Sequence, residues 1–578
     1  MPKTHALDAA CVGTLLAVKD WRKPTLSVSC TGRGSYQRMR LDRYGFPRGY
    51  LSRDKRMHGY QTGDLARAEV PSGKTAGTHV GRVAVRATGY FNLQMAGSVV
   101  QGIAHRYCQL IQRSDGYGYT RIALPKGETG RRPCCARRAI PSRPEGRGFP
   151  CISMKIQIQG GTIIDPAAGT EERKDVFIAA GRIVGVGGAP ADFNAVKVID
   201  ASGLCIAPGF VDLSARLREP GFEHKATLES EMAAAMAGGV TSLVCPPDTD
   251  PVLDEPGLVE MLKFRAQKLH LAHVYPLGAL SVGLKGETIT EMVQLTEAGC
   301  VGFSQADNPI VDTRTLLRAL QYATTYGFTV WLRPQDAYMA KGGVAASGAV
   351  ASRLGLSGVP VSAETIALHT IFELMRVTGA RVHLSHLSSA TGVALVRAAK
   401  AEGLAVSCDV TINHAHLTDV DIGYFDAQFR LDPPLRSQRD RDAIRAGLED
   451  GTIDAICSDH TPLDDDEKLL PFAEATPGAT GLELLLSLTV KWAREADVPL
   501  AKALSRITSA PADVLKLPAG RIATGALADL CVFDAAGEWR VDPQKLKSQG
   551  RNTPFLGYEL PARVRATVVV GHVAYESR

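Results

Sequence analysis

The strongest constraint on the fold is a regular alternation of short apolar segments with longer stretches whose apolar residues recur at helical spacing. Apolar strands that alternate with helices favour consecutive βα units and a parallel sheet. Eight such units close into a (β/α)8 barrel, in which the chemistry lies at the carboxyl ends of the strands. The sequence therefore predicts an α/β protein with a TIM-type barrel over residues 208–515, whose strands are expected at 210–213, 242–245, 273–275, 301–303, 329–332, 382–384, 406–408 and 454–457.

Short strands with tight turns flank this region on both sides. Residues 155–165 alternate in polarity, turn at Gly160-Gly161 and continue as a second strand, and residues 528–534 and 566–575 show the same kind of pattern near the other end. We therefore expect residues 154–207 and 516–578 to form one small composite β-domain beside the barrel.

The first 153 residues differ in composition from the rest of the chain. Residues 1–150 hold 26 Lys+Arg against 9 Asp+Glu, a balance of +17, whereas the remainder holds 40 against 51, a balance of −11. Such a basic segment is typical of a nucleic-acid arm or of a transit peptide. Sustained periodicity is weak there, so we favour a basic extension of low order and expect the native chain to begin at Met154.

Composition narrows the setting of the protein. The apolar fraction is 45%, and no apolar run approaches the roughly 18 residues that a membrane span needs. The 12 cysteines include no Cys-x-x-Cys pair, which favours reduced thiols over a disulfide framework or a zinc finger. We therefore expect a cytoplasmic protein without a membrane partner.

Six motifs, in order along the chain, carry a specific resemblance. The first is Asp212-Leu-Ser-Ala-Arg-Leu-Arg-Glu-Pro-Gly221, directly after the first expected strand. Together with the others it resembles the dihydroorotase family of the amidohydrolase superfamily, from about Met154 to Arg578. The remaining five motifs are Pro-Pro-Asp-Thr at 246–249, His-Leu-Ser-His-Leu-Ser-Ser at 383–389, Asp-Pro-Pro-Leu-Arg at 432–436, Ser-Asp-His-Thr-Pro at 458–462 and Asn-Thr-Pro-Phe-Leu-Gly at 552–557.

The resemblance implies a zinc site that this chain does not reproduce. Active relatives use zinc to polarise a ring amide and to lower the pKa of a bound water, with ligands after strands one, four, five, six and eight. His386 and the catalytic position Asp459 are retained, and we expect Asp459 to be vestigial. We expect no cofactor, with zinc only if the enzyme interpretation holds, because the other four ligand positions carry Ser214, Arg216, Gln305 and Arg333.

The two arginines suggest a replacement for the charge of the metal. We hypothesise that Arg216 and Arg333 pair with Asp459, which would otherwise be a buried carboxylate without a partner. The fourth-strand position stays open, since Asp307 lies two residues beyond Gln305 and a local shift of the alignment would supply one carboxylate there.

Positions that bind substrate in the family are also altered. Arg218 stands where the family binds the substrate carboxylate, although a structural ion pair with Glu219 or Glu223 is an equal alternative. Asp248 replaces the expected asparagine, and an acid there would repel an anionic substrate. Leu463 replaces a histidine, so recognition of the substrate is expected to be lost together with the metal.

Other histidines and cysteines are interpreted as structural. An unorthodox metal site that joins four such histidines to His386 remains an alternative, but packing roles are favoured for the four. The two strand cysteines are typical of small buried apolar residues. The residues concerned are His383, His414, His416, His460, Cys408 and Cys457.

Two functions from different classes remain. The first is a non-catalytic partner of aspartate carbamoyltransferase, the role of relatives that lack the metal ligands, in a hetero-oligomer that could also contain a homodimer. The second is an active dihydroorotase or related cyclic amidohydrolase with an unusual metal site. Nucleic-acid binding through residues 1–150 is a weaker third. Metal content and dihydroorotate hydrolysis separate the first two.

Overall fold

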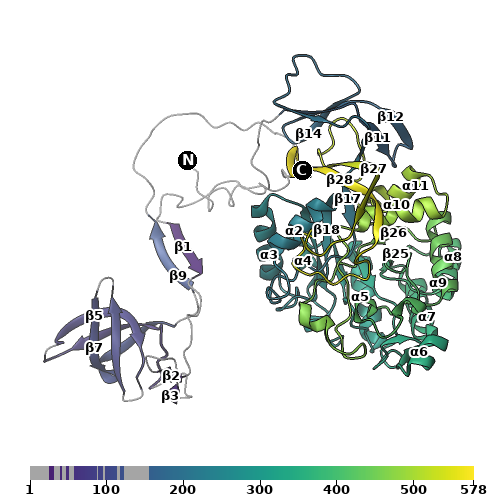
Figure 1. Ribbon diagram of the computed structural model, residues 1–578. Coiled ribbons are helices and arrows are strands. Elements are labelled where there is room, and N and C mark those ends of the chain that lie inside the picture. Colours follow the sequence, from purple (N-terminus) through teal and green to yellow (C-terminus); the bar gives the residue numbers. More distant parts are fainter. Residues whose placement is uncertain are drawn as a thin grey trace. The chain divides into compact units, whose positions relative to one another are not determined.

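The computed structural model describes residues 155–577, residues 58–113 except 74, 87, 88, 96 and 97, and four strands within 25–122. The chain divides into two compact units, Met1–Ile140 and Pro141–Arg578 (Figure 1). The expected start at Met154 lies outside the described residues. No helix in the described ranges is long and apolar enough to cross a membrane.

Eight parallel strands form the barrel of the larger unit and confirm the predicted fold. They follow one another around the sheet in chain order. A parallel bridge between Ala215 and His460, just beyond the first and last strands, joins the two edges of this sheet. The strands are β17 (Phe210–Asp212), β18 (Val240–Cys245), β19 (His273–Ala279), β20 (Gly302–Ser304), β21 (Thr329–Leu332), β24 (Arg381–Leu384), β25 (Val406–Thr411) and β26 (Ala455–Cys457).

Helices alternate with these strands in the sequence and surround the barrel (Figure 1). In α5 the buried residues Leu316, Ala319, Leu320 and Ala323 recur at three- and four-residue spacing, so one face of the helix packs inward. The helices are α2 (Leu228–Ala237), α3 (Pro256–Leu269), α4 (Met292–Ala298), α5 (Thr313–Tyr326), α6 (Ala349–Leu354), α7 (Val361–Thr378), α8 (Ala390–Glu402), α9 (Gln438–Asp450), α10 (Leu485–Glu495), α11 (Leu500–Ser505) and α12 (Ser509–Leu515). A short parallel pair, β22 (Ala345–Ala346) and β23 (Gly358–Val359), flanks α6.

Strands from both ends of the larger unit share one six-stranded sheet, in the order β12-β11-β16-β27-β28-β29. β16 pairs antiparallel with β27, which brings Cys205 opposite Phe533 although they lie far apart in sequence. A second, four-stranded sheet has the order β14-β13-β10-β15. The bounds are β10 (Ile156–Gln159), β11 (Thr162–Asp165), β12 (Thr170–Arg173), β13 (Val176–Ala179), β14 (Arg182–Val186), β15 (Lys197–Asp200), β16 (Cys205–Pro208), β27 (Leu530–Arg540), β28 (Glu559–Val569) and β29 (His572–Glu576).

The smaller unit contains an antiparallel five-stranded sheet, in the order β7-β6-β5-β4-β8. Phe91, Leu93 and Ile103 are buried in its core. The presence of this sheet corrects the expectation of a low-order extension for these residues. In β4 small apolar residues alternate with charged ones, and buried alanines give only a weak periodic signal in the sequence. The bounds are β4 (Leu65–Val70), β5 (Gly77–Ala84), β6 (Tyr90–Met95), β7 (Ser98–Ala104) and β8 (Cys108–Gln112), with further pairs β1 (Thr25–Cys30) with β9 (Tyr117–Ile122) and β2 (Met39–Leu41) with β3 (Pro47–Tyr50).

Candidate active site

The predicted site residues follow the carboxyl ends of different barrel strands and therefore meet at one mouth of the barrel. Three of them adopt a left-handed backbone conformation, with φ of 62° at Arg218, 59° at His386 and 49° at Asp459. Such backbone is costly for residues other than glycine and gathers at functional sites. The residues are Ser214, Arg216 and Arg218 after β17, Asp248 after β18, Gln305 after β20, Arg333 after β21, His386 after β24 and Asp459 after β26.

Arg216 lies at the centre of an ion-pair network. Its side chain is only 10% exposed, and its Nε donates to Asp248 Oδ2 at 2.7 Å. One terminal nitrogen contacts Asp307, and the other lies 3.4 Å from Asp459 Oδ1 and donates to Thr461 Oγ1 at 3.1 Å. A single guanidinium therefore neutralises carboxylates from three strand ends.

Arg333 extends the network in another direction. Its side chain is 6% exposed and binds Asp432 with both terminal nitrogens, the Nη1–Oδ2 bond measuring 2.8 Å. Nη1 also lies 3.1 Å from Asp307 Oδ1, so Asp307 bridges the two arginines. The hypothesised pair of Arg333 with Asp459 is wrong, because the loop after β25 brings Asp432 within bidentate reach and Asp432 takes that place.

Opposing effects of burial and charge set the protonation of this network. Burial alone would raise the pKa of Asp307, but the attraction of Arg216 and Arg333 outweighs it and holds this pKa below its usual range. Burial raises the pKa of Asp459, and the attraction of His386 and Arg216 does not fully offset that increase. Asp307 is thus the firmly ionised carboxylate of the mouth.

Arg218 has neither of the expected acidic partners. Its Nε donates to the backbone oxygen of Pro462 at 2.9 Å, and Glu219 pairs instead with Arg265 at 2.9 Å. Burial, followed by the repulsion of Arg216, lowers the pKa of Arg218 to about 10. The structural ion pair with Glu219 or Glu223 considered above is therefore not formed.

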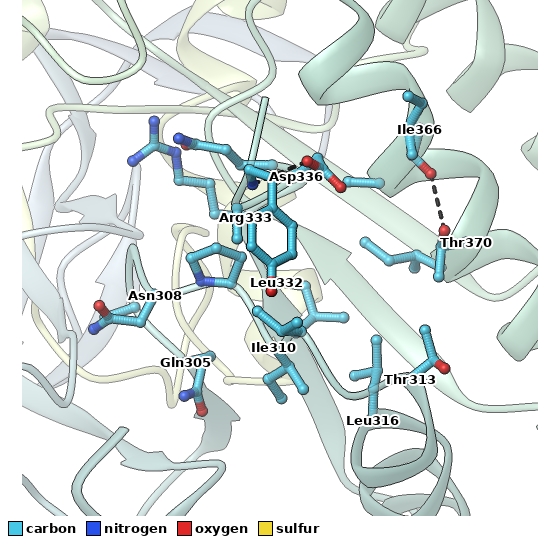
Figure 2. Close-up of a pocket in the computed structure, with 18 residues that line it drawn as sticks. Gln305, Asn308, Ile310, Thr313, Leu316, Leu332, Arg333, Asp336, Ile366 and Thr370 are labelled. Carbon is cyan, nitrogen blue, oxygen red and sulfur yellow. Dashed lines mark hydrogen bonds between the residues drawn. The ribbon is translucent and has the colours of Figure 1, made fainter. Parts of the chain in front are cut away.

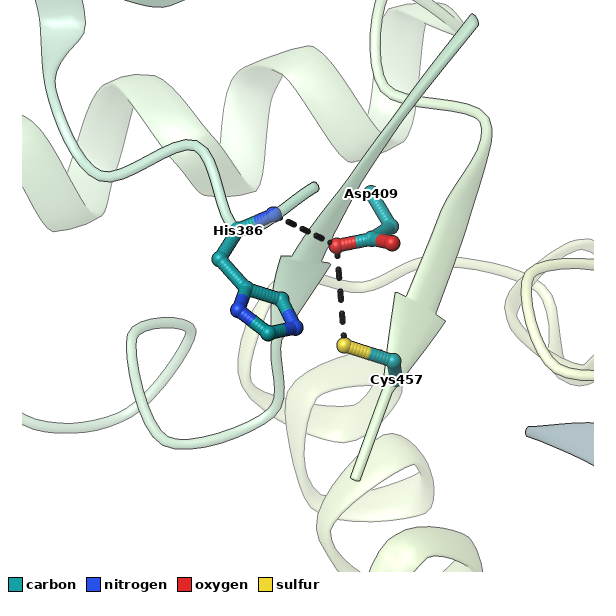
Figure 3. A group of neighbouring side chains, drawn as sticks. All are labelled: His386, Asp409 and Cys457. Atoms are coloured by element: carbon teal, nitrogen blue, oxygen red, sulfur yellow. Dashed lines mark hydrogen bonds between the residues drawn. The ribbon is translucent and has the colours of Figure 1, made fainter. Parts of the chain in front are cut away.

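His386 occupies a ligand position that the resemblance implies, but its ring has no hydrogen-bond partner in the described structure. The ring is 5% exposed, its two nitrogens make no hydrogen bond in the described structure, and Nε2 lies 3.8 Å from Asp459 Oδ1. Figure 3 shows the ring beside Asp409 and Cys457, the single group of three or more possible metal ligands among the described residues.

This group is already engaged in other contacts. Asp409 accepts from the His386 backbone N–H at 2.7 Å and from His383 Nε2 at 2.9 Å, and Cys457 Sγ lies 3.5 Å from Asp409 Oδ1. Burial, followed by the charge of Asp409, raises the pKa of Cys457 well above its usual range, which disfavours the thiolate that a metal needs.

Gln305 and Ser214 offer no replacement for the missing ligands. Gln305 accepts a hydrogen bond from Ser281 Oγ at 2.9 Å, and its buried Nε2 has no partner in the described structure. An amide nitrogen is a donor and does not coordinate a cation. Ser214 is buried, and its backbone N–H points to Asp212 at 3.4 Å.

The residues present therefore do not fit the binuclear zinc site that the resemblance implies. Zinc sites use imidazole, thiolate or carboxylate ligands, and catalytic sites keep three protein ligands and one open position. Arg216 brings a permanent cation to within 3.4 Å of Asp459, one of the two ligands that remain. A second cation there would have to displace this guanidinium.

The four other histidines that could have joined an unorthodox metal site are buried, and three of them make the hydrogen bonds given next. His383 Nδ1 bonds Ser407 at 2.8 Å, His416 Nε2 bonds Leu488 O at 2.9 Å and His460 Nε2 bonds Glu231 at 2.6 Å. Burial lowers the pKa of His414 to about 4 and that of His416 to about 3, so both are neutral near pH 7. Their roles in the described structure are those of packing residues.

A cavity of about 140 Å³ lies beside the network, between the loops that follow β20 and β21 and helices α5 and α7. Figure 2 shows Leu332 and Ile310 among its apolar lining, with Thr370 bonded to the backbone of Ile366. Gln305 and Arg333 also line it, but the terminal nitrogens of Arg333 are committed to Asp432 and Asp307. The cavity thus has no free cation from the network to hold an anionic ring substrate.

The barrel and these strand-end motifs define an amidohydrolase-type scaffold. A family model described as amidohydrolase family matches residues 363–575, and one described as dihydro-orotase-like matches residues 203–391. L-hydantoinase (dihydropyrimidinase) from Arthrobacter aurescens shares the fold with a TM-score of 0.66 at 22% identity, over 73% of this chain and 96% of that one.

Sequence relatives place the chain more narrowly. A dihydroorotase-like protein of Pseudomonas aeruginosa is 45% identical over 423 residues, covering 73% of this chain and 100% of that protein. A dihydroorotase of Geobacter sp. (strain M21) is 39% identical over 424 residues, covering 73% of this chain and 100% of that protein. The chain belongs to the dihydroorotase-like family of cyclic amidohydrolases.

Sequence reasoning identified the altered ligand positions but missed most of their partners. The sequence indicates Asp432 only as part of a motif and Asp307 only as an alternative ligand, yet in the structure both bind arginines. Two arginines in place of metal ligands imply carboxylate partners. The acidic residues near the strand ends were therefore the sequence feature that could have indicated these partners.

Proposed function

We propose that this chain is a non-catalytic member of its family and acts as a structural or regulatory partner of aspartate carbamoyltransferase in the cytoplasm. The observation that supports the loss of catalysis is the position of Arg216, whose guanidinium contacts Asp248, Asp307 and Asp459 together. These carboxylates would otherwise be available to a metal or to an attacking water.

Hydrolysis of a ring amide near neutral pH needs an activated water and an electrophile that polarises the carbonyl. Asp459 is the only retained carboxylate of the ligand set, and its charge is shared with Arg216 at 3.4 Å. Burial raises the pKa of Asp459, but its Oδ1 faces Arg216, so an attacking water placed there would compete with the guanidinium. The mouth therefore lacks the means to generate the nucleophile.

The proposed partnership has a separate basis. The chain retains the complete barrel and the signature loops while the chemistry is lost, which is the pattern of relatives that assemble with aspartate carbamoyltransferase. A scaffold that is retained without its active site favours a function in binding another protein. We propose a hetero-oligomer with carbamoyltransferase subunits, in which this chain could itself be dimeric.

Two measurements test the two halves of the proposal. Elemental analysis of the purified full chain, with a dihydroorotate hydrolysis assay, is expected to give neither stoichiometric zinc nor turnover. Carbamoyltransferase activity of the enzyme from the same genome, assayed with and without this chain, is expected to rise or to change its regulation when the chain is present. Stoichiometric zinc with turnover would refute the loss of catalysis, and no effect on an enzyme that does not co-purify would refute the partnership.

One observation favours the alternative of an active cyclic amidohydrolase with an unusual metal. His386 presents two buried ring nitrogens without a hydrogen-bond partner, close to Asp459 at 3.8 Å. A metal bound there would satisfy the ring. In that case zinc content would fall in a His386→Gln variant together with activity, whereas the non-catalytic proposal expects no zinc in either protein.

A further inference from the structure

Two loops after consecutive barrel strands pack against each other at the mouth side of the barrel. The Tyr424 loop, residues 418–430, follows β25, and the Leu469 loop, residues 464–476, follows β26. The side-chain ammonium of Lys468 donates to the backbone oxygens of Ala427 and Arg430, both at 3.0 Å. Phe472 shares a small buried cluster with Ile422, so the two loops form one unit.

This unit exposes large apolar side chains that a monomer would be expected to bury. Tyr424 is 92% exposed and Leu469 is 83% exposed, the two highest values among the exposed large apolar residues of the described structure. Val420, Phe425 and Leu470 are also exposed, at 61%, 39% and 45%. Scattered exposed apolar residues are normal, but a group of five on two bonded loops is typical of an interaction surface.

Contacts within the Tyr424 loop order its start and its aromatic tip. Tyr424 and Phe425 make an edge-to-face contact with ring centroids 5.5 Å apart. Asp421 accepts from the backbone N–H of Thr418 at 2.7 Å and so fixes the start of the Tyr424 loop. Rigid aromatic groups lose little entropy on binding, which is why they dominate protein interfaces.

The charge at the surface of this unit is predominantly negative. The two loops contain eight carboxylates and only two cations, Arg430 and Lys468. Lys468 is 7% exposed and is bound to backbone oxygens, and Arg430 bonds its neighbour Leu431 O at 3.2 Å. Asp426, Asp465 and Asp466 are exposed, so the apolar tips stand in an acidic surround.

We propose that the Tyr424 loop and the Leu469 loop together form a docking surface for a protein partner with a basic surface and apolar sockets. The acidic surround selects a basic partner and repels a second acidic surface, while the apolar tips supply the buried contacts. This inference rests on the proposed function, because it names the surface that would hold the carbamoyltransferase partner.

The test compares the full chain with matched variants in binding to the carbamoyltransferase catalytic chain of the same genome, measured by sedimentation. Tyr424→Ser/Leu469→Ser is expected to weaken binding by at least about tenfold. Asp465→Asn/Asp466→Asn is expected to weaken it less and to flatten its dependence on ionic strength between about 0.05 M and about 0.3 M. The control Tyr326→Ser/Val377→Ser removes side chains that are 56% and 73% exposed. They lie at the carboxyl ends of α5 and α7, away from the barrel mouth, and this variant is expected to bind as the unaltered chain does.

A second measurement separates the failure of this inference from that of the proposed function. Tyr424 is replaced by the photo-crosslinking residue p-benzoylphenylalanine in the native host, with Val377 replaced in the control, and the adduct is identified by mass spectrometry. An adduct through a basic peptide of the carbamoyltransferase supports both proposals. An adduct at position 424 alone with a basic peptide of another identified protein supports the surface and overturns the proposed partner.

Two outcomes overturn the docking surface. One is unchanged carbamoyltransferase binding by both loop variants, which leaves the proposed function standing and places the interface elsewhere. The other is the absence of any adduct at position 424, or equal adducts at positions 424 and 377. Circular dichroism and the melting temperature of each variant exclude misfolding as the cause of a loss.

Discussion

Replacement of Arg216 by methionine removes the cation at the centre of the barrel mouth while preserving most of the side-chain volume. The Asp459 side chain, 10% exposed, would keep only His386 at 3.8 Å as a partner. Asp307 would keep Arg333 at 3.1 Å and is 36% exposed, and Asp248 is 25% exposed, so water compensates part of their loss. Most of the expected loss in the free energy of unfolding therefore comes from leaving Asp459 without this ion pair.

The magnitude follows from the price of leaving a buried charge unpaired. Removing one partner of a buried ion pair lowers the free energy of unfolding by about 3–5 kcal/mol. The entropy of unfolding of roughly 420 residues is about 0.9 kcal/mol per kelvin, at about 2.1 cal/mol/K for each residue. Arg216→Met is thus expected to lower the melting temperature by about 3–6 °C if the larger unit unfolds in one transition.

The assay is a thermal melt by circular dichroism at pH 5 and pH 8, with a rescue variant. Without Arg216 the folded-state pKa of Asp459 rises further above its unfolded value, so the destabilisation is expected to be largest at pH 8 and to shrink as the carboxyl protonates at lower pH. Arg216→Met/Asp459→Asn is expected to recover much of the lost stability, because the uncompensated charge is gone.

Two results would refute this reasoning. A melting temperature of Arg216→Met within about 1 °C of the unaltered protein would mean that the network contributes no more than a surface ion pair does. Failure of Asp459→Asn to rescue the variant would mean that lost packing, and not the unpaired carboxylate, causes the destabilisation. Arg376→Met, which breaks an exposed pair with Glu402, is the matched control and is expected to change little.

Three further predictions concern groups outside the network. Burial, followed by the charge of Arg430, lowers the pKa of Lys468 to about 7. Between about pH 7 and 10.5 the unfolded chain therefore holds a proton that the folded chain lacks, so the free energy of unfolding should rise with pH. Lys468→Met should remove this pH dependence in thermal melts across the same range. Burial raises the pKa of Glu483 to about 7, so stability should fall as the pH rises from about 4.5 to 7, and Glu483→Gln should abolish the decline. Thr227 caps α2 through the Ser230 N–H at 3.2 Å, and Thr227→Ala should cost about 1 kcal/mol in denaturant titrations, with Thr227→Ser near neutral.

The barrel could be predicted from the sequence because its evidence is local. The strands are short segments rich in apolar residues, as in β18, where all six residues are buried, and their alternation with helices leaves few topologies. The predicted segment 301–303 differs from the observed β20 by one residue, since strand ends depend on hydrogen bonds that the apolar pattern does not encode. In the sheet of β4–β8, strand β4 gave only a weak apolar signal because it buries alanines at alternate positions.

The identities of the site residues and the pair of Arg216 with Asp459 were predictable, whereas the other pairings were not. Motif order placed Ser214, Arg216 and Arg333 at strand ends, but the partner of a long arginine side chain depends on loop geometry. Asp432 lies 99 residues from Arg333 in sequence, on a loop whose path no periodicity describes. The preference of guanidinium for a bidentate carboxylate decides the pairing once that loop is in place.

The same geometry changes the meaning of Asp248. Taken alone, an acid in place of the family's asparagine repels an anionic substrate and so indicates only a loss of substrate recognition. In the structure its Oδ2 accepts from Arg216 at 2.7 Å, so the aspartate supplies the counter-charge for an arginine that stands where a neutral ligand is expected. An asparagine at 248 would leave Arg216 with two acids instead of three, and a histidine at 216 would leave Asp248 without its partner. The two departures therefore depend on each other physically, and restoring either position alone is expected to destabilise the mouth without restoring a metal site.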